Sequence, residues 1–342
     1  MNKLLKYNQA KLEIMNLIAG DSLEIGARLP PERDLVSRFN LSMITVRRAL
    51  KDLERQGFLE RRNRLGTFLR KSIQKEDMER ILFIRIYKEE YKETPRPPEY
   101  SHHVSELLSQ KLINMQFIAA KEPDIATANE AKGCIGIFVQ GWLTQEWLDF
   151  LKMLNTPTVV LGANPFPDQL PTVSYDWKYA GEGLTEEFIS CGYKKIGLIN
   201  GGPTYYPAKQ MYEGYCLAMA KAKRKIDDKL VIWPGHPQMH KHICDYLDAN
   251  PDCDALIIEN GALIPFLQCN WNRPLAHRMP LGMIGDSEAS SNFFKHLDHG
   301  LLMAFEESIY IAGVDMIFSM FSSEPQANPI KLIRPQLYRS SN

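Results

Sequence analysis

Apolar residues near the amino terminus recur at helical spacing in three successive segments, which predicts three helices. Pro31 suits the first turn of the second segment, and Ser42 can cap the third. The short connector 40–42 is typical of a helix-turn-helix. The apolar positions of the three segments are, in order, Leu12, Met15 and Ile18; Leu35, Val36 and Phe39; Val46, Ala49, Leu50 and Leu53.

The pattern changes after Gly57, which is expected to end the third helix. Residues 58–62 and 66–70 then read as two short strands around a tip at 63–65. The tip and its flanks carry Arg61, Arg62 and Arg64. The first seventy residues therefore predict three helices followed by a basic β-hairpin, which is a winged helix-turn-helix.

From residue 81 onward, short apolar runs alternate with amphipathic helical stretches. Such alternation predicts parallel sheets covered by helices on both faces. The expected strands are 81–87, 115–120, 134–139, 158–162, 195–200, 230–233, 254–258 and 281–285, and the expected helices are 145–154, 179–191, 208–223, 239–247 and 306–321. The predicted fold class is α/β, with a winged helix-turn-helix domain at 1–70, a charged linker at 71–80 and a larger domain at 81–342.

The composition indicates the cellular compartment and shows that charge is unevenly distributed along the chain. No apolar run approaches the roughly 20 residues of a membrane span, and the polar start gives no signal peptide, so we expect a cytoplasmic protein without membrane contact. The chain of 342 residues is neutral overall, yet residues 1–70 carry a net charge of +6 and the remainder −6. A basic first domain on an acidic body favours a head that binds a polyanion.

The six cysteines show no C-x-x-C pair, so in a cytoplasmic chain we expect all of them to be reduced and buried. His236, His240 and His242 lie close in sequence, but no cysteine or carboxylate pattern accompanies them, so we expect no metal site. Residues 200–203 lack the Lys-Ser/Thr of a phosphate loop, and no H-E-x-x-H or G-x-S-x-G motif occurs. We therefore expect neither catalysis nor a cofactor.

The amino-terminal segment resembles the GntR family of winged-helix transcription factors. The resemblance covers about the first seventy residues, with three helices and a wing in the family's order. It rests on Leu29-Pro30, Glu32-Arg33, Leu35, Ser42, Thr45-Val46-Arg47, Ala49-Leu50 and Gly66-Thr67-Phe68. It implies a recognition helix in the major groove of DNA and a wing near the minor groove. The residues expected to contact DNA are Arg33, Ser42, Met43, Ile44, Thr45, Arg47, Arg48, Arg62 and Arg64.

Two positions depart from the family pattern. Family members often carry Arg at the position of Met43 and a polar residue at that of Ile44, and apolar side chains there can contact thymine methyl groups but cannot donate to guanine. We expect more A·T character in the operator at those bases. Arg64 stands where the family usually has Gly, a residue that permits a tight turn.

The larger domain resembles the effector domain of LacI-type regulators, which is related to periplasmic sugar-binding proteins. The resemblance rests on the order and spacing of residues 171–176, 180–183, 191–201, 212–215, 254–257, 282–286 and 332–341. It implies two Rossmann-like subdomains with a ligand in the cleft between them, and the combination is similar to the arabinose-regulator subgroup of the GntR family. The expected effector-binding residues are Tyr87, Trp142, Phe166, Asp176, Trp177, Tyr205, Asn260 and Asp286.

The resemblances together imply a DNA-binding transcriptional regulator, expected to be a repressor that a small molecule releases from a near-palindromic operator as a homodimer. A carbohydrate is the expected effector, since carboxylates accept from hydroxyls while aromatic rings cover a sugar. Met211 stands where the family has a ligand-gripping Arg, so a nucleoside, a polyol or a protein partner stays open as the effector. Activation instead of repression also stays open.

Overall fold

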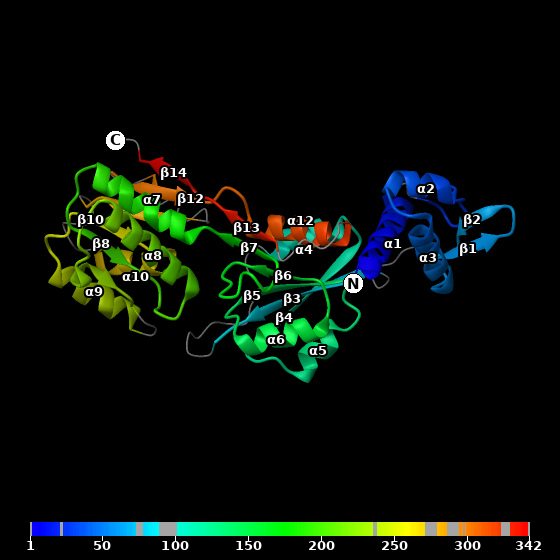
Figure 1. Cartoon of the computed structure of the whole chain (residues 1–342), viewed down its shortest axis with the longest axis horizontal. Coiled ribbons are helices and arrows are strands. Elements are labelled where there is room, and N and C mark those ends of the chain that lie inside the picture. Colours follow the sequence, from blue (N-terminus) through cyan, green and yellow to red (C-terminus); the bar gives the residue numbers. More distant parts are fainter. Residues whose placement is uncertain are drawn as a thin grey trace.

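A computed structural model describes residues 2–20, 23–72, 78–88, 101–234, 238–270, 279–285, 294, 295, 297, 299–322 and 329–340. Three bodies follow one another along the molecule (Figure 1): a helical head with a hairpin, a first α/β subdomain and a second one. The fold class predicted from the sequence is confirmed. Among the described residues, no helix combines the length and the apolar character needed to cross a bilayer.

The head has a hydrophobic core of its own. Its buried side chains include Met15 from the first helix, Leu35 from the second, and Leu50 and Leu53 from the third. The head consists of α1 (Asn2–Gly20), α2 (Glu32–Phe39), α3 (Met43–Arg55), β1 (Leu59–Arg62) and β2 (Gly66–Leu69). The predicted three helices and wing are all present.

Local backbone chemistry sets the ends of these elements. The Ser42 hydroxyl accepts a hydrogen bond from the Thr45 N–H at 3.2 Å and so caps α3, as the sequence predicted. Gly57 follows α3 with a φ of +82°. In the wing, β1 and β2 are antiparallel, and Arg64 adopts a left-handed φ of +64° at the tip. The tip therefore keeps the tight turn that a glycine would favour.

The first subdomain is built on a parallel sheet in the order β13-β7-β6-β5-β3-β4. Alternate residues of β3 enter separate cores, since Leu82 and Ile84 face α5 and α6 while Phe83 faces α4 and α12. Its elements are β3 (Glu79–Ile86), α4 (Ser101–Ser109), β4 (Ile113–Ala120), α5 (Ile125–Ala131), β5 (Gly136–Gly141), α6 (Gln145–Leu154), β6 (Thr158–Leu161), β7 (Thr172–Tyr175), α12 (Ile309–Ser322) and β13 (Ile330–Ile333). Because β3 begins at Glu79, the last two residues of the predicted linker 71–80 are strand residues.

The second subdomain has the sheet order β14-β12-β11-β10-β8-β9, parallel except for β14. Its elements are α7 (Trp177–Ser190), β8 (Ile196–Ile199), α8 (Tyr206–Lys221), the 3-10 turn η3 (Asp228–Leu230), β9 (Val231–Ile232), α9 (Met239–Ala249), β10 (Ala255–Ile258), α10 (Asn260–Asn270), β11 (Leu281–Gly285), β12 (Leu301–Ala304) and β14 (Gln336–Arg339). The sequence did not predict α10, which contains Pro265, a residue that argues against a helix.

The chain crosses between the subdomains at residues 175–177, 304–309 and 333–336, and these crossings touch one another. The Phe305 ring stacks on Tyr175 with centroids 4.1 Å apart. The Asp176 N–H donates to the Ile333 carbonyl at 2.9 Å. A set of parallel connections at one edge is the arrangement that permits a hinge motion between two rigid bodies.

One prediction about the cysteines is wrong. Cys244 in α9 and Cys269 in α10 form a disulfide, with Cα atoms 5.5 Å apart. The two residues are 25 positions apart, and only the packing of α9 against α10 brings them together. The other four cysteines are free thiols, of which Cys253 is buried and Cys191 is exposed.

Close packing of α7 on α8 gives a test of the fold. A Cβ added at Gly214 would overlap the Lys178 carbonyl oxygen. We expect Gly214→Ala to lower the free energy of unfolding by about 1–3 kcal/mol, because the helices must move apart. Thermal and urea unfolding of the full chain measure this, and the neighbouring exposed Glu213→Ala should stay within about 0.5 kcal/mol of the wild type. Equal stability of both variants would contradict the observed helix contact.

Candidate DNA-binding surface and effector cleft

The first turn of α3 presents an unusual apolar side chain. Ile44 is 80% exposed, although large apolar residues elsewhere in the head are mostly buried. Ser42, whose hydroxyl also lies 2.7 Å from that of Thr45, places both polar groups on the same turn. An exposed isoleucine flanked by hydroxyl groups at a helix start can contact a ligand surface that is part apolar and part hydrogen-bonding.

Glu32 at the start of α2 holds two arginines between the recognition helix and the wing. Its carboxylate lies 2.6 Å from the Arg47 Nε and 3.0 Å from the Arg61 guanidinium. Both arginines are solvent-accessible, and exposed ion pairs of this kind contribute little to stability. Arg47 can therefore exchange Glu32 for another anion at low cost. Arg33, the next residue of α2, is also exposed.

Arg48 does not lie beside Arg47. Its guanidinium is placed over the Tyr7 ring of α1, 5.0 Å from the centroid. The Tyr7 hydroxyl donates to Asp52, and burial together with this hydrogen bond raises the pKa of Tyr7 above its ordinary value. The phenol is thus neutral, and Arg48 is held at the junction of α1 and α3 by a cation–π contact.

The wing and the start of α2 enclose a groove of about 540 Å³ lined by arginines. Arg62 lies over the Phe68 ring at 4.6 Å and pairs with Glu60 at 3.3 Å, while Arg64 is exposed at the tip. Arg28 also lines this groove and was not singled out from the sequence. Arg28 reaches the groove because its backbone pairs with Phe68 of β2. This contact joins residues far apart in the sequence, so no local pattern could predict it.

A cleft of about 530 Å³ lies between the two subdomains, which is within the usual range for ligand sites. Three of the residues expected to bind an effector, Trp142, Trp177 and Tyr205, line this cleft. Trp142 comes from the first subdomain and Tyr205 from the second, and their rings are 5.7 Å apart. Further aromatic lining comes from Tyr175, Tyr206 and Tyr310.

The cleft also contains polar residues that were not predicted from the sequence. Arg85 and Gln140 lie at the ends of β3 and β5, Lys209 lies on α8, and Glu259 follows β10. The Gln140 amide donates to the Tyr310 hydroxyl at 2.9 Å. Glu259 is only 6% exposed and accepts from the Gly261 N–H at 2.8 Å. Arg85, Gln140 and Glu259 lie at the carboxyl ends of parallel strands, where open α/β sheets bind their ligands. Their positions could therefore have been predicted from the expected strands.

Other predicted effector residues have different places. Asp176 caps α7 by accepting from the Tyr179 N–H at 3.0 Å, and it faces Arg334 at 3.7 Å in the hinge instead of lining the cleft. Phe166 packs half-buried on the core of the first subdomain. Tyr87 lies under Lys121, 5.9 Å from its ring centroid. The Asn260 side chain and Asp286 fall outside the described residues.

Met211 is fully buried where α7 meets α8, so its position does not face the cleft. The same helix supplies Lys209 to the cleft lining instead. A cation from α8 therefore lines the cleft, although Met211 stands where the family has an Arg.

The chain thus consists of a winged-helix domain followed by a body of two α/β subdomains with a cleft between them. Residues 6–69 match the gntR family of bacterial regulatory proteins. Residues 123–264 match the periplasmic binding proteins and sugar binding domain of the LacI family. The chain therefore carries a GntR-family head on a LacI-type, periplasmic-binding-protein-like body.

Individual relatives agree with this division. The chain is 26% identical over 204 residues to the arabinose metabolism transcriptional repressor of Geobacillus stearothermophilus, a match that covers 56% of this chain and 55% of that one. The match thus spans about half of the curated relative. Among solved structures, a CelR–cellobiose complex superposes with a TM-score of 0.59 at 16% identity, covering 88% of this chain and 90% of that one. The structure of Cra from Pseudomonas putida in complex with fructose 1-phosphate superposes with a TM-score of 0.61 at 14% identity, covering 77% of this chain and 99% of that one.

Proposed function

We propose that this protein is a transcriptional repressor whose affinity for operator DNA is controlled by a carbohydrate bound in the cleft. One observation carries the proposal: α12 runs from the cleft to the head. Ile309 and Tyr310 at its start line the cleft. At its other end Phe318 and Phe321 lie with Leu12 of α1 around a shared pocket. One helix thus touches both the ligand site and the DNA-binding domain.

The head has the chemistry for reading DNA. With α3 in the major groove, Arg47 can leave Glu32 and donate to a guanine, while Met43 and Ile44 contact thymine methyl groups. Arg62 and Arg64 on the wing then lie near the negative potential of the minor groove. Two such heads in a homodimer require two half-sites, hence a near-palindromic operator.

The cleft has the chemistry for holding a sugar. Aromatic rings from both subdomains can cover the apolar faces of a sugar ring, and Gln140, Arg85 and Glu259 offer donors and acceptors for its hydroxyl groups. The relatives support this class, since solved structures of the same fold contain cellobiose and fructose 1-phosphate. Arg85 and Lys209 also allow a sugar that carries an anionic group.

Control follows from differential affinity. A ligand that contacts Trp142 and Tyr205 at once binds the closed cleft better than the open one, so it shifts the hinge toward closure. Closure moves the start of α12, and the contact of α12 with α1 carries that motion to the head. We propose that the closed form spaces the two heads of the dimer wrongly for the operator, so that ligand relieves repression.

The DNA-binding part is tested on an operator selected from random DNA, with the full chain and fluorescence anisotropy at several salt concentrations. We expect Arg47→Ala to weaken binding by about 1–3 kcal/mol, because a base contact is lost. Arg64→Ala should weaken binding to all sequences about equally and reduce the salt slope by about 1, because one positive charge near the DNA is lost. Lys194→Ala, an exposed change on the body, is the control. Wild-type binding by both arginine variants would contradict the assigned surface.

The ligand part is tested by thermal unfolding with pentoses, hexoses, disaccharides, sugar phosphates, polyols and nucleosides. A ligand at about 100 times its dissociation constant should add roughly 2.7 kcal/mol of stability. We expect one carbohydrate class to do so, and Trp142→Leu and Glu259→Gln to abolish the shift. Trp233→Leu, which changes a tryptophan packed on Tyr212 away from the cleft, should keep it. A shift with polyols or nucleosides alone would overturn the carbohydrate assignment.

A further inference from the structure

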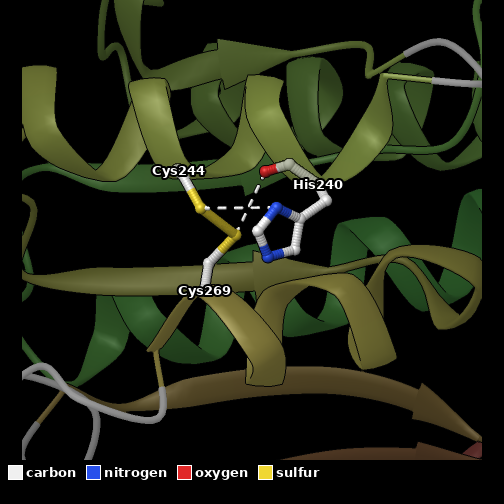
Figure 2. A group of neighbouring side chains, drawn as sticks. All are labelled: His240, Cys244 and Cys269. Carbon is white, nitrogen blue, oxygen red and sulfur yellow. Dashed lines mark hydrogen bonds between the residues drawn. A yellow bond between two sulfur atoms is a disulfide. The ribbon is translucent and has the colours of Figure 1, made fainter.

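Three side chains suited to a metal ion meet between α9 and α10, outside the cleft and the DNA-binding surface. His240 and Cys244 are four residues apart on α9 and so share one face of that helix. Cys269, near the end of α10, meets them from the neighbouring helix (Figure 2). Histidine positions alone could not predict this group, because its other members are cysteines that packing brings together.

The distances match the needs of a small ion with nitrogen and sulfur ligands. The His240 Nδ1 lies 3.9 Å from the Cys244 Sγ, and the three donor atoms lie within 4.8 Å of one another. Tetrahedral zinc with its usual bond lengths sets nitrogen and sulfur about 3.6 Å apart and two sulfurs about 3.8 Å apart. Small side-chain rotations therefore reach the required geometry once the sulfurs are free to separate.

The disulfide and a bound metal ion are alternatives, since the same two sulfurs serve both. A dithiol reductant supplies two electrons and two protons, the S–S bond breaks, both cysteines become thiols, and the reductant becomes a disulfide. A disulfide needs no imidazole beside it, yet the His240 ring lies against this one. The position of the His240 imidazole beside both sulfurs therefore indicates a role other than a structural disulfide alone.

We propose that His240, Cys244 and Cys269 form a binding site for Zn²⁺ in the reduced protein. Zinc replaces the two thiol protons and takes the neutral imidazole as its third ligand, with water in the fourth position. His240 is exposed and Cys244 is half-buried, so an ion can enter from solvent. Thiolate and imidazole ligands favour zinc over Mg²⁺ or Ca²⁺.

The site joins the same two helices in both states and lies next to the cleft. Met239, the residue before His240, and Gly261 in the first turn of α10 both line the cleft. Either the disulfide or a bound zinc ion thus cross-links α9 to α10.

The test uses the full chain, reduced with a phosphine under anaerobic conditions and titrated with Co²⁺, followed by displacement with Zn²⁺. Thiol counting before and after reduction should show a gain of two. We expect one Co²⁺ per chain, with thiolate charge-transfer and tetrahedral d–d absorption, and loss of both bands on adding one Zn²⁺. The unreduced protein should give neither band.

Variants assign the ligands. Cys244→Ser, Cys269→Ser and His240→Ala should each weaken Co²⁺ binding by at least roughly tenfold. Cys191→Ser, an exposed free thiol, and His242→Ala, an exposed histidine on the same helix, are the matched controls and should bind as the wild type does. Circular dichroism checks that each variant is folded.

Four results would overturn the proposal. The first is a thiol count that does not rise on reduction, since the cysteines are then not available. The second is reduced wild-type protein that binds no ion. The third is wild-type affinity in Cys244→Ser or Cys269→Ser, and the fourth is equal loss of binding in His242→Ala.

Discussion

Three chain crossings join the subdomains of the body, and their packing against one another is the constraint on which the rest of the structure depends. Phe305 stacks on Tyr175 and meets the edge of Trp177, so each crossing holds the next in place. Tyr175 and Trp177 also line the cleft. The hinge and the cleft therefore share these two rings. In the proposed function, a ligand that closes the cleft acts directly on the hinge. The cap that Asp176 places on α7 fixes where the second subdomain begins.

The head is coupled to the body through α1, which packs into the hydrophobic cores of both. Leu12 is buried in the core of the body, whereas Ile14 and Met15 are buried in the core of the head. Lys11 pairs with Glu79 at the start of β3, 2.6 Å away, with both side chains largely covered. A helix shared in this way transmits a rotation of the body to the recognition helix, since packed cores shift as rigid units.

Features set by local sequence could be predicted from the sequence, whereas features that depend on long-range packing could not. Helical spacing and the Ser42 cap gave the recognition helix, and alternating apolar runs gave the two parallel sheets. The strands β7, β12, β13 and β14 were not predicted. Of these, β13 and β14 are mostly exposed strands at sheet edges, so they carry no run of buried residues. The cleft residues Arg85 and Glu259 were missed, while Asp176 was assigned to ligand binding although it caps a helix. The Cys244–Cys269 pair likewise depends on how α9 meets α10.

In the proposed function, α12 and α1 couple the cleft to the head. Measuring operator affinity with and without the cleft ligand tests this coupling. The wild type and Leu12→Ala are compared, with Leu217→Ala on the surface of α8 as the matched control. We expect the ligand to change operator affinity about 5- to 150-fold in the wild type and the control. In Leu12→Ala, operator and ligand should each still bind, but the ratio should fall toward one. A wild-type ratio in Leu12→Ala would contradict the coupling route.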